Sequence, residues 1–592
     1  PATPDDRRAG PPPEPPRRAV ERAADGSTGA LPRAQVVATL AGVLLALLLA
    51  GLDQTIVSTA GPAIQRSLGM SAALYPWLTT SYLVASTVMV PIYGKLSDTY
   101  GRKPVLLVAI GVFLGGSVLC GLSPTTGTLI AARAVQGLGA AGLFTSAFAV
   151  IADIFPPAVR GKYTGLVGAV FGLSSVVGPL AGGFLTDHLG WHWVFFVNLP
   201  IGALAVWFIT TRMPRLGGQA GAKPRLDLAG AFWLVVAVVP LLLALSFGRG
   251  EGAATTVAPP DGAHGWTSPR SLALFGLSLL GTLCFVRAER RAASPVVDLG
   301  LFRQRVVSLS LAATFVLGAG FLSAVVFLPL FMVNVAGVSA TRAGLTMTPL
   351  SLGMVAGSVL GGRVVTRLGR YKGLMLGAVA FLFAGFAVMA LTIQPTSTQG
   401  ELTLKMVLLG LGMGPTLPLY TLAVQNATSP REIGVVTAAS TFARSLGQVF
   451  GVALVGSVFA ATLATAVADE TARVLAPLPP AARAELAAAM ARPAAAVSTE
   501  VTAEVAPGGA EGAATAAGGV GFDAAAVRGR LREPAALGAV AGLEAAAKRA
   551  FTTAIRHLYL TGMAFVALGA LLTLFIPGLP LRQTAARPSP AE

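Results

Sequence analysis

Three ionisable residues lie inside long apolar stretches of the sequence: Asp53, Arg133 and Arg444. A charged side chain at bilayer depth is costly, and by default it marks a transport pathway or a proton relay. Desolvation favours the protonated form of a carboxyl group, whereas a nearby cation favours its ionised form. Asp53 close to Arg133 would therefore be poised to load and release a proton.

Asp53 and Arg133 are expected at a similar depth. Asp53 lies about 17 residues into an expected span over 36–60, which is roughly 25 Å along the helix axis. Arg133 lies about six residues, or roughly 9 Å, into an expected span over 127–150 that starts from the opposite face. Two interpretations stay open: a proton carrier with its electrostatic partner, or a static ion pair that holds the two spans in register.

Arg444 lies about 11 residues, or roughly 17 Å, into an expected span over 433–462, near the middle of the bilayer. It would either line a cavity or lock two halves of the protein together. Gln136 and Gln448 are further candidates for a cavity or an interface.

The composition is that of a polytopic all-α membrane protein. The 592 residues are 54% hydrophobic and 12% charged, whereas about 25% of the residues in a globular protein are charged. Apolar runs of 18 or more residues recur, and each is long enough to cross a bilayer. The net charge of +17 does not indicate a nucleic-acid partner, because the basic residues lie in short loops beside apolar runs.

Several classes of chemistry are not expected. The two cysteines, Cys120 and Cys284, fall inside expected spans, so no disulfide framework is implied. No G-x-x-x-x-G-K-[ST] phosphate loop occurs. The four scattered histidines (His188, His192, His264 and His557) do not predict a metal site. No catalytic constellation lies in a soluble segment of sufficient size, so we expect neither an enzyme nor a bound cofactor.

Fourteen spans are expected, and Lys and Arg in the short loops orient them. With the N-terminus in the cytoplasm, 27 Lys and Arg fall in cytoplasmic segments and 5 in short external ones. Both termini are therefore expected inside. The expected spans are 36–60, 74–93, 104–122, 127–150, 163–185, 191–211, 228–247, 271–288, 307–332, 343–361, 372–392, 403–424, 433–462 and 553–577.

The expected domains follow from these spans. They are a disordered cytoplasmic tail without a signal peptide (1–35), a six-helix bundle (36–211), two linker helices (228–288), a second six-helix bundle (307–577) and a cytoplasmic tail (578–592). The second bundle contains a long external loop, 463–552, whose apolar content is mostly Ala and too small to bury a core. Segments Ala481–Ala491 and Ala524–Arg549 could form short helices there. A solvated insert and a functional cap both remain open.

A charged segment recurs at a constant offset of 268 residues. Residues 94–104 read G-K-L-S-D-T-Y-G-R-K-P, and residues 362–370 read G-R-V-V-T-R-L-G-R. Gly94, Gly101 and Arg102 recur as Gly362, Gly369 and Arg370, whereas Asp98 is replaced by Thr366. Two homologous halves with a substrate site between them are typical of secondary transporters.

The segment from Gly94 to Pro104, a charged loop between two spans, resembles the loop signature of the major facilitator superfamily. The resemblance implies that Asp98, Arg102 and Lys103, with Gly94 and Gly101, form a latch on the cytoplasmic gate. It also implies that the acid faces the end of a helix of the other half.

Four further stretches resemble the fourteen-helix drug:proton antiporters of this superfamily, the multidrug resistance efflux type. They are L-D-Q-T-I-V-S-T-A-G-P at 52–62, R-A-V-Q-G-L-G at 133–139, G-P-L-A-G-G at 178–183 and W-H-W-V-F-F-V-N-L-P-I-G at 191–202. Ser58, Gly61 and Ser174 depart from the family's usual residues. The resemblance extends over residues 35–582, except for most of the loop 463–552.

The glycine motif of the fifth span has a physical interpretation. Gly178, Gly182 and Gly183 lack a Cβ and allow a close helix approach, and Pro179 removes a backbone donor and bends the helix. A bent, closely packed helix between the two bundles would suit a rocking hinge. Ordinary small-residue packing is the alternative.

The resemblance implies a monomeric efflux transporter of a bacterial plasma membrane, driven by the proton gradient and without a cofactor. It would export drugs, antibiotics or natural products that are small and amphipathic or lipophilic. Asp53 would carry the proton, with Arg133 as its partner. The alternatives are a lipid or glycolipid exporter with 463–552 as an external guide, and a non-transporting membrane sensor or scaffold.

Overall fold

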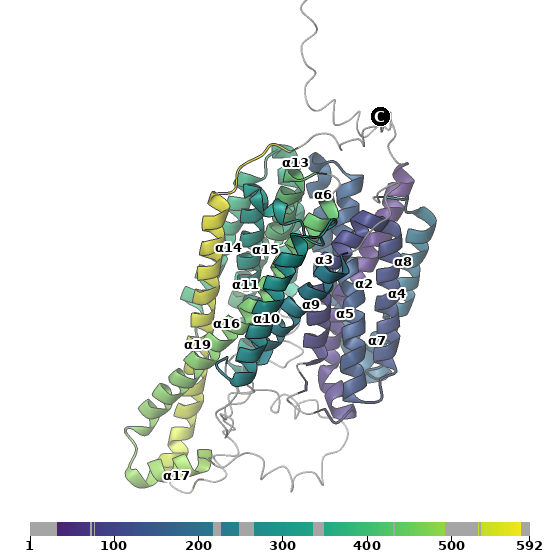
Figure 1. Ribbon diagram of the computed structural model, residues 1–592. Helices are drawn as coiled ribbons and strands as arrows, with labels where there is room; N and C mark the ends of the chain where they lie inside the picture. The colour runs from purple at the N-terminus through teal and green to yellow at the C-terminus, as the bar shows by residue number, and fades with distance from the viewer. Residues whose placement is uncertain are drawn as a thin grey trace, which may run out of the picture.

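A computed structural model describes residues 32–70, 74, 75, 77–216, 227–247, 266–335, 348–429, 432–491, 531 and 534–581. Nearly parallel helices stand side by side in it, the first part of the chain on one side and the last part on the other (Figure 1). The two tails and the loop 492–530 lie outside the described residues.

The first six spans form one group of helices. They are α2 (Arg33–Ser67), α3 (Trp77–Tyr100), α4 (Arg102–Gly121), α5 (Thr126–Ile154), α6 (Pro157–His188), and α7 (Trp193–Phe196) followed directly by α8 (Asn198–Arg212). Their inward faces share one large apolar cluster, which includes Leu47, Tyr82, Phe113, Phe148 and Ile209.

The last six spans form a second group. They are α11 (Arg305–Asn334), α13 (Thr348–Leu368), α14 (Lys372–Thr392), α15 (Gln399–Ala427), α16 (Ile433–Leu475) and α19 (Pro534–Leu574). A separate apolar cluster holds them together and includes Phe331, Tyr371, Phe386, Tyr420 and Tyr559.

Two further helices, α9 (Leu228–Phe247) and α10 (Pro269–Glu289), connect the groups and are followed by a short 3-10 helix, η2 (Leu299–Arg303). They pack beside the seam where α3 meets α16: Leu234 and Val238 of α9 share a cluster with Val88 and Ile92 of α3, and Phe442 of α16 packs against it.

All fourteen predicted spans coincide with helices in the described residues. Twelve of these helices meet length and hydropathy criteria for crossing a membrane. The other two, α3 with 24 residues and α11 with 30, are also long enough at 1.5 Å per residue. The expected polytopic all-helical fold is therefore confirmed.

The sequence suggested that the segment from Gly94 to Pro104 is a charged loop. In the structure it is not a loop. Helix α3 continues to Tyr100 and α4 begins at Arg102, so only Gly101 lies between them. Gly101 has φ +93°, a conformation that L side chains rarely adopt. The repeated segment ends in the same way at Gly369, with φ +64°. Helix continuation places Asp98 on the last turn of α3.

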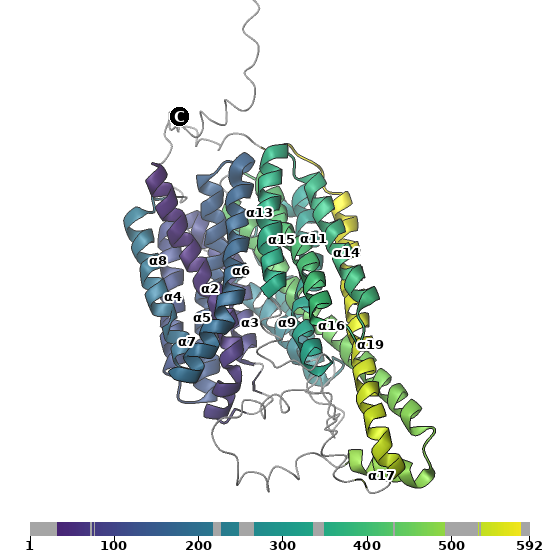
Figure 2. The same cartoon turned by 180° about the vertical axis from the view of Figure 1, so that it is seen from behind.

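The segment 463–552 contains more structure than expected. Helix α16 extends to Leu475, α17 occupies Pro480–Ala491, and α19 begins at Pro534. The three helices project beyond the bundle, with α17 at the tip (Figures 1 and 2). Leu486 of α17 packs with Val540 and Leu543 of α19 in a small buried cluster. The expectation that this segment cannot bury a core is therefore wrong for its described parts.

Candidate functional site

Asp53 and Arg133 form an ion pair between α2 and α5. Their Oδ2 and Nη1 atoms lie 2.6 Å apart, and both side chains are fully buried. Arg133 also donates from Nε to the carbonyl oxygen of Leu78 at 3.0 Å, and its guanidinium lies 4.4 Å from the ring centre of Tyr82. The two residues that depth alone suggested as partners are therefore in direct contact.

Gln136 belongs to the same buried network. It lies three residues after Arg133, on the same side of α5. Its Nε2 donates to Asp53 Oδ1 at 2.7 Å, and its Oε1 accepts from Arg133 Nη1 at 2.7 Å. In the structure its amide bonds to both charged partners, and its role as a cavity or interface residue stays a prediction.

Two network members were not identified from the sequence. Asn198, the first residue of α8, donates from Nδ2 to Asp53 Oδ1 at 3.3 Å and to Ser117 Oγ at 2.9 Å. Ser117 of α4 in turn donates to the carbonyl oxygen of Phe195. Both are polar residues in apolar spans, and that is the signal that could have revealed them. The network joins α2, α4, α5 and α8.

The Asp53 network contains one hydrogen-bond acceptor that no described residue uses. Asn198 Oδ1 is buried and has no hydrogen-bond partner among the described residues. If Asp53 were protonated, its hydroxyl would become a donor and Arg133 would retain its bonds to Leu78 and Gln136. The guanidinium would therefore remain anchored while the carboxyl group changes state.

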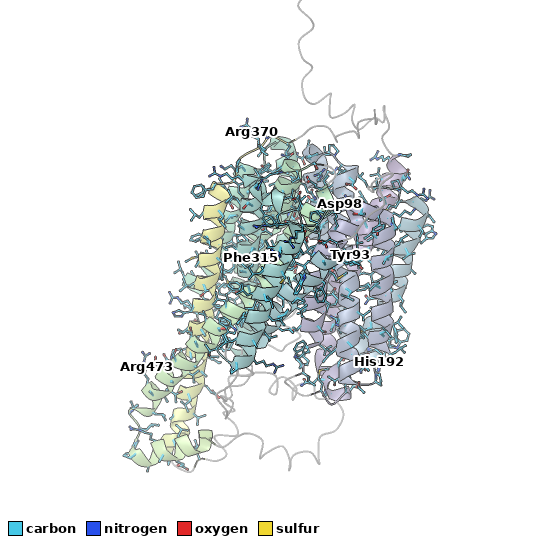
Figure 3. The ribbon with its side chains drawn as sticks, viewed as in Figure 1. Tyr93, Asp98, His192, Phe315, Arg370 and Arg473 are labelled. Carbon is cyan, nitrogen blue, oxygen red and sulfur yellow. The ribbon has the colours of Figure 1, made fainter. Side chains whose placement is uncertain are left out.

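A second cluster surrounds Asp98 (Figure 3), on the last turn of α3, where this helix meets the start of α16. Asp98 Oδ1 accepts from the backbone N–H of Gly434 at 3.0 Å, and Oδ2 accepts from that of Val435 at 2.8 Å. These N–H groups belong to the first turn of α16, where the helix dipole favours an anion. Asp98 thus connects the two helix groups, as the resemblance implied.

Arg102 completes the Asp98 cluster. Its guanidinium lies 2.5 Å from Asp98 Oδ1 and 2.7 Å from Asp153 Oδ2 of α5. Glycines make room for the cluster: a Cβ on Gly434 would lie 2.3 Å from Asp98 Oδ1, and one on Gly94 would lie 2.4 Å from the Cβ of Ala438.

Lys103 was expected in the same cluster, but it lies elsewhere. Its Nζ donates to the carbonyl oxygens of Thr210 and Met213, at 2.9 Å each, and so satisfies the end of α8. Lys372 does the same for α19 through the carbonyl oxygen of Leu574 at 3.0 Å. Lys372 lies one residue past the repeat position of Lys103, and each lysine joins the start of one helix to the end of another helix in its own half.

The glycine motif of α6 was expected between the two bundles, but its contacts lie elsewhere. A Cβ on Gly178 or Gly182 would collide with Thr55 or Thr59 of α2, which is in the same half, and a Cβ on Gly183 would have no atom within 4 Å. Pro179 lies within α6. The motif therefore packs inside the first group of helices and not between the halves.

The contact between the halves uses other small residues of α6. Gly161, Gly165, Gly168 and Gly172 approach α13 along its length. A Cβ on Gly362 of α13 would lie 2.1 Å from the carbonyl oxygen of Gly161. Buried Arg160, which sequence reasoning missed, donates from Nη1 to Gln425 of α15 at 3.1 Å. The halves thus adhere at the end that holds the Asp98 cluster.

Arg444 and Gln448 lie one turn apart on α16, and both are partly buried. Phe442 of this helix packs toward α3 and α9, whereas a Cβ on Gly447 would meet Phe315 of α11. Arg444 and Gln448 share a side of α16 with Thr437, a residue bonded to Gln425 of α15, and the backbone of Arg444 also lies against Gly318 of α11. Arg444 Nε is buried without a hydrogen-bond partner, and no carboxylate pairs with Arg444 among the described residues.

Comparison with known proteins gives a consistent result. A family model described as the Major Facilitator Superfamily matches residues 43–452, more than half of the chain. Multidrug transporter protein MdtP of Bacillus subtilis is 37% identical over 440 residues, covering 74% of this chain and 78% of that protein. Multidrug resistance protein 3 of the same organism is 39% identical over 417 residues, covering 70% and 78% respectively.

A solved structure is similar in fold. The crystal structure of the human organic anion transporter MFSD10 (TETRAN) matches with a TM-score of 0.52 and 18% sequence identity, covering 72% of this chain and 93% of that one. At this identity the likeness concerns the fold alone.

Proposed function

Because the chain belongs to the major facilitator superfamily, and is thus a membrane transporter and not an enzyme, we propose that it exports small amphipathic or lipophilic compounds in exchange for protons. The two relatives named as multidrug proteins, at 37% and 39% identity, support the export of drugs, antibiotics or natural products. Alternating access between the two halves moves the compound. The proton gradient supplies the energy, no cofactor takes part, and the transporter works as a monomer in a bacterial plasma membrane.

The buried Asp53–Arg133 pair is the observation that carries the proton coupling. The Asp53 carboxylate has no exposed surface and is held by a guanidinium and two amides. Its negative charge is costly unless every partner stays in place. A rearrangement that admits water to Asp53 would let the carboxyl group take up a proton. The change back to the described conformation would release that proton. Proton binding is thereby tied to the conformational cycle.

The Asp98 cluster is proposed to latch the cytoplasmic gate. In the described conformation the halves adhere at the end that contains Asp98, Gly161 and Gly362. The excess of Lys and Arg in the loops of that end supports a cytoplasmic location for it and for both termini. The described conformation is then closed toward the cytoplasm.

A lipid or glycolipid exporter is the second candidate, and the projecting helices favour it. Helices α16 and α19 continue beyond the bundle and pack with α17, where they could guide a lipid away from the membrane. A non-transporting sensor or scaffold would show no flux of any compound.

A reconstituted assay tests the proposal. The purified protein is placed in liposomes with an imposed pH gradient, and extrusion of the lipophilic dye Hoechst 33342 is followed together with the internal pH. We expect dye movement coupled to opposite proton movement. Asp53→Asn should abolish the coupled flux, whereas Asp469→Asn, an exposed acid on the projecting part of α16, should leave it unchanged. Undiminished pH-driven dye extrusion by Asp53→Asn would refute the coupling role of Asp53. An equal loss of coupled flux in Asp53→Asn and Asp469→Asn would indicate a defect of folding. A wild type that moves fluorescent lipid but no dye would favour the second candidate.

A further inference from the structure

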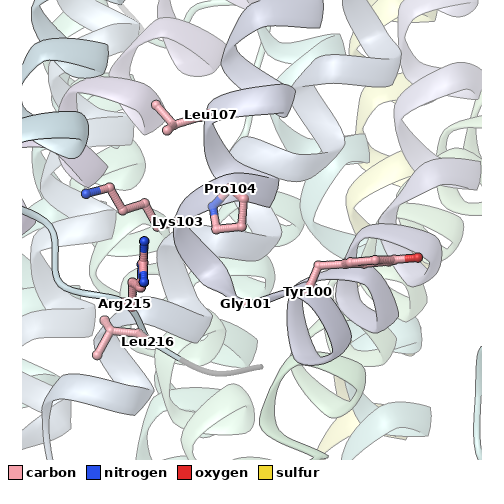
Figure 4. A pocket seen from close by; sticks show the side chains of 7 residues that line it. All are labelled: Tyr100, Gly101, Lys103, Pro104, Leu107, Arg215 and Leu216. Atoms are coloured by element: carbon pink, nitrogen blue, oxygen red, sulfur yellow. The ribbon is translucent and has the colours of Figure 1, made fainter. Parts of the chain in front are cut away.

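A cavity of about 430 Å³ lies beside the break between α3 and α4 (Figure 4). Seven residues line it: Tyr100, Gly101, Lys103, Pro104, Leu107, Arg215 and Leu216. Two of them are basic and none is acidic. The volume is within the range of small-ligand sites, roughly 300–1,000 Å³. None of the seven lining residues belongs to the Asp53 network.

The cavity has fixed walls. The backbone N–H of Arg102 donates to the carbonyl oxygen of Leu216 at 2.8 Å, which ties the segment after α8 to the start of α4. Lys103 Nζ is held by Thr210 and Met213 at 2.9 Å each. Arg215 is exposed and has no hydrogen bond or ion pair with another described residue. A stationary ammonium and a free guanidinium therefore share one cavity.

The second half has a different residue at the repeat position of Lys103. In the second half the segment after α19 returns to the equivalent break, where the N–H of Leu581 donates to the carbonyl oxygen of Gly369. Tyr371 occupies the repeat position of Lys103, at the offset of 268 residues. Its ring is fully buried in the apolar cluster of that half, and its hydroxyl donates to Pro577 O at 3.1 Å. At this position the second half has a buried aromatic ring, and the next residue, Lys372, bonds to the end of α19.

The helices that border the cavity carry exposed apolar side chains. Val108 of α4 is 60% exposed and Trp207 of α8 is 52% exposed, so both helices present apolar side chains outward next to the cavity. Trp is enriched where a bilayer meets water. The cavity lies where α4 begins and α8 ends, and the ends of membrane-spanning helices are expected at the level of the lipid headgroups.

We propose that this cavity binds the phosphate group of an anionic phospholipid. Lys103 and Arg215 contact the phosphate, and the acyl chains lie along the outward faces of α4 and α8, next to Leu107. Basic pockets at the cytoplasmic ends of membrane helices suit anionic headgroups. The bound lipid would stabilise the segment 213–216, which is attached to Arg102, and the side chain of Arg102 belongs to the Asp98 cluster.

Lipid binding to the delipidated full-length protein, measured by native mass spectrometry, tests the proposal. Phosphatidylglycerol should bind to the wild type at one saturable site at least tenfold more tightly than phosphatidylcholine. Arg215→Gln should weaken phosphatidylglycerol binding about fivefold, the effect expected for one cation near an anionic surface. Lys103→Tyr, which introduces the residue of the second half, should weaken it further by filling the cavity.

The control is Arg367→Gln, because Arg367 is an exposed arginine on the last turn of α13, just before the repeated break, and does not line the cavity. It should leave phosphatidylglycerol binding unchanged. Equal weakening by Arg215→Gln and Arg367→Gln would mean a diffuse basic surface and would overturn the proposal. Equal affinity for phosphatidylcholine, or displacement of the lipid by millimolar glycerol phosphate, would do so as well. If Lys103→Tyr does not fold, the comparison of the two arginine variants still decides.

Discussion

Asp98 on α3 accepts a hydrogen bond from the backbone N–H of Val435 on α16, with 2.8 Å between Oδ2 and N. The two residues are 337 positions apart, so this bond joins the first and second halves of the chain. A carboxylate at a helix N-terminus interacts with the helix dipole as well as with the N–H groups. The same carboxylate pairs with Arg102. A change at Asp98 is therefore expected to act on the balance between conformations.

Asp98→Asn should weaken the closed conformation at this end of the bundle. The amide has no charge, and its NH₂ group cannot accept from the N–H of Gly434 or Val435. A hydrogen bond to a charged group contributes about 1.5–3 kcal/mol, so the population ratio should shift by about tenfold or more. Spin-label distances between α3 and α16 in detergent would record the shift. Thr366→Val, at the repeat position, is the control, because Thr366 donates to Gly362 within its own helix. Unchanged distances in Asp98→Asn would exclude the latch role.

Arg133→Ala should destabilise the protein strongly, and Asp53→Asn should relieve part of that loss. Removing the guanidinium leaves a buried carboxylate without its cation, at a cost of about 3–5 kcal/mol. Arg133→Lys should be milder because it keeps the charge, although it cannot reproduce the bonds to Leu78, Asp53 and Gln136 together. Thermal unfolding of the wild type, the single variants and the double variant gives the coupling free energy. Additive losses would mean that the ion pair contributes nothing to stability.

Gly362→Ala should separate α6 from α13, whereas Gly183→Ala should be tolerated. A Cβ at Gly362 would lie 2.1 Å from the carbonyl oxygen of Gly161, and a backbone atom cannot move without displacing its helix. At Gly183 a Cβ would have no atom within 4 Å. Thermal stability and spin-label distances across the α6–α13 contact distinguish the two. Greater damage from Gly183→Ala would mean that the antiporter motif has its close contact in another conformation.

The expected depth of each residue in the bilayer was sufficient to pair Asp53 with Arg133, because few partners are available to a charged side chain in an apolar helix. The same reasoning could not identify Asn198 or Ser117, since their contacts depend on the rotation of α8 and α4 about their axes. Lys103 was misplaced for a related reason: proximity in the sequence to Asp98 does not reveal that its side chain turns toward the end of α8. The glycines of α6 illustrate a third limit, because a small residue predicts a close approach but not the partner.

Deleting residues 492–530 should leave the fold intact, whereas Leu543→Ser should loosen the projecting helices. The deleted segment lies outside the described residues, and Leu543 is buried with Leu486 of α17. Placing a hydroxyl in this small cluster costs about 1–3 kcal/mol. Protease added to intact spheroplasts should cut the wild type between α17 and α19, with the two fragments remaining associated, and should cut Leu543→Ser at additional sites. Cleavage in inverted vesicles alone would contradict the external location.

Arg444→Gln should impair export of anionic compounds more than export of cationic ones. The backbone of Arg444 lies against Gly318 of α11, and no carboxylate among the described residues pairs with its guanidinium. An uncompensated cation in a region of low dielectric attracts an anionic group of a substrate. Losing one charge-assisted hydrogen bond corresponds to about a tenfold increase in KM for such a substrate.

The test compares the export of carboxyfluorescein with that of ethidium in inverted vesicles, with Arg444→Lys expected to lie between the wild type and Arg444→Gln. Gln448→Ala, one turn further, keeps the charge and should preserve the preference for anions. Equal losses for both dyes in Arg444→Gln would assign Arg444 to locking the halves together, because a structural contact cannot discriminate by the charge of the compound.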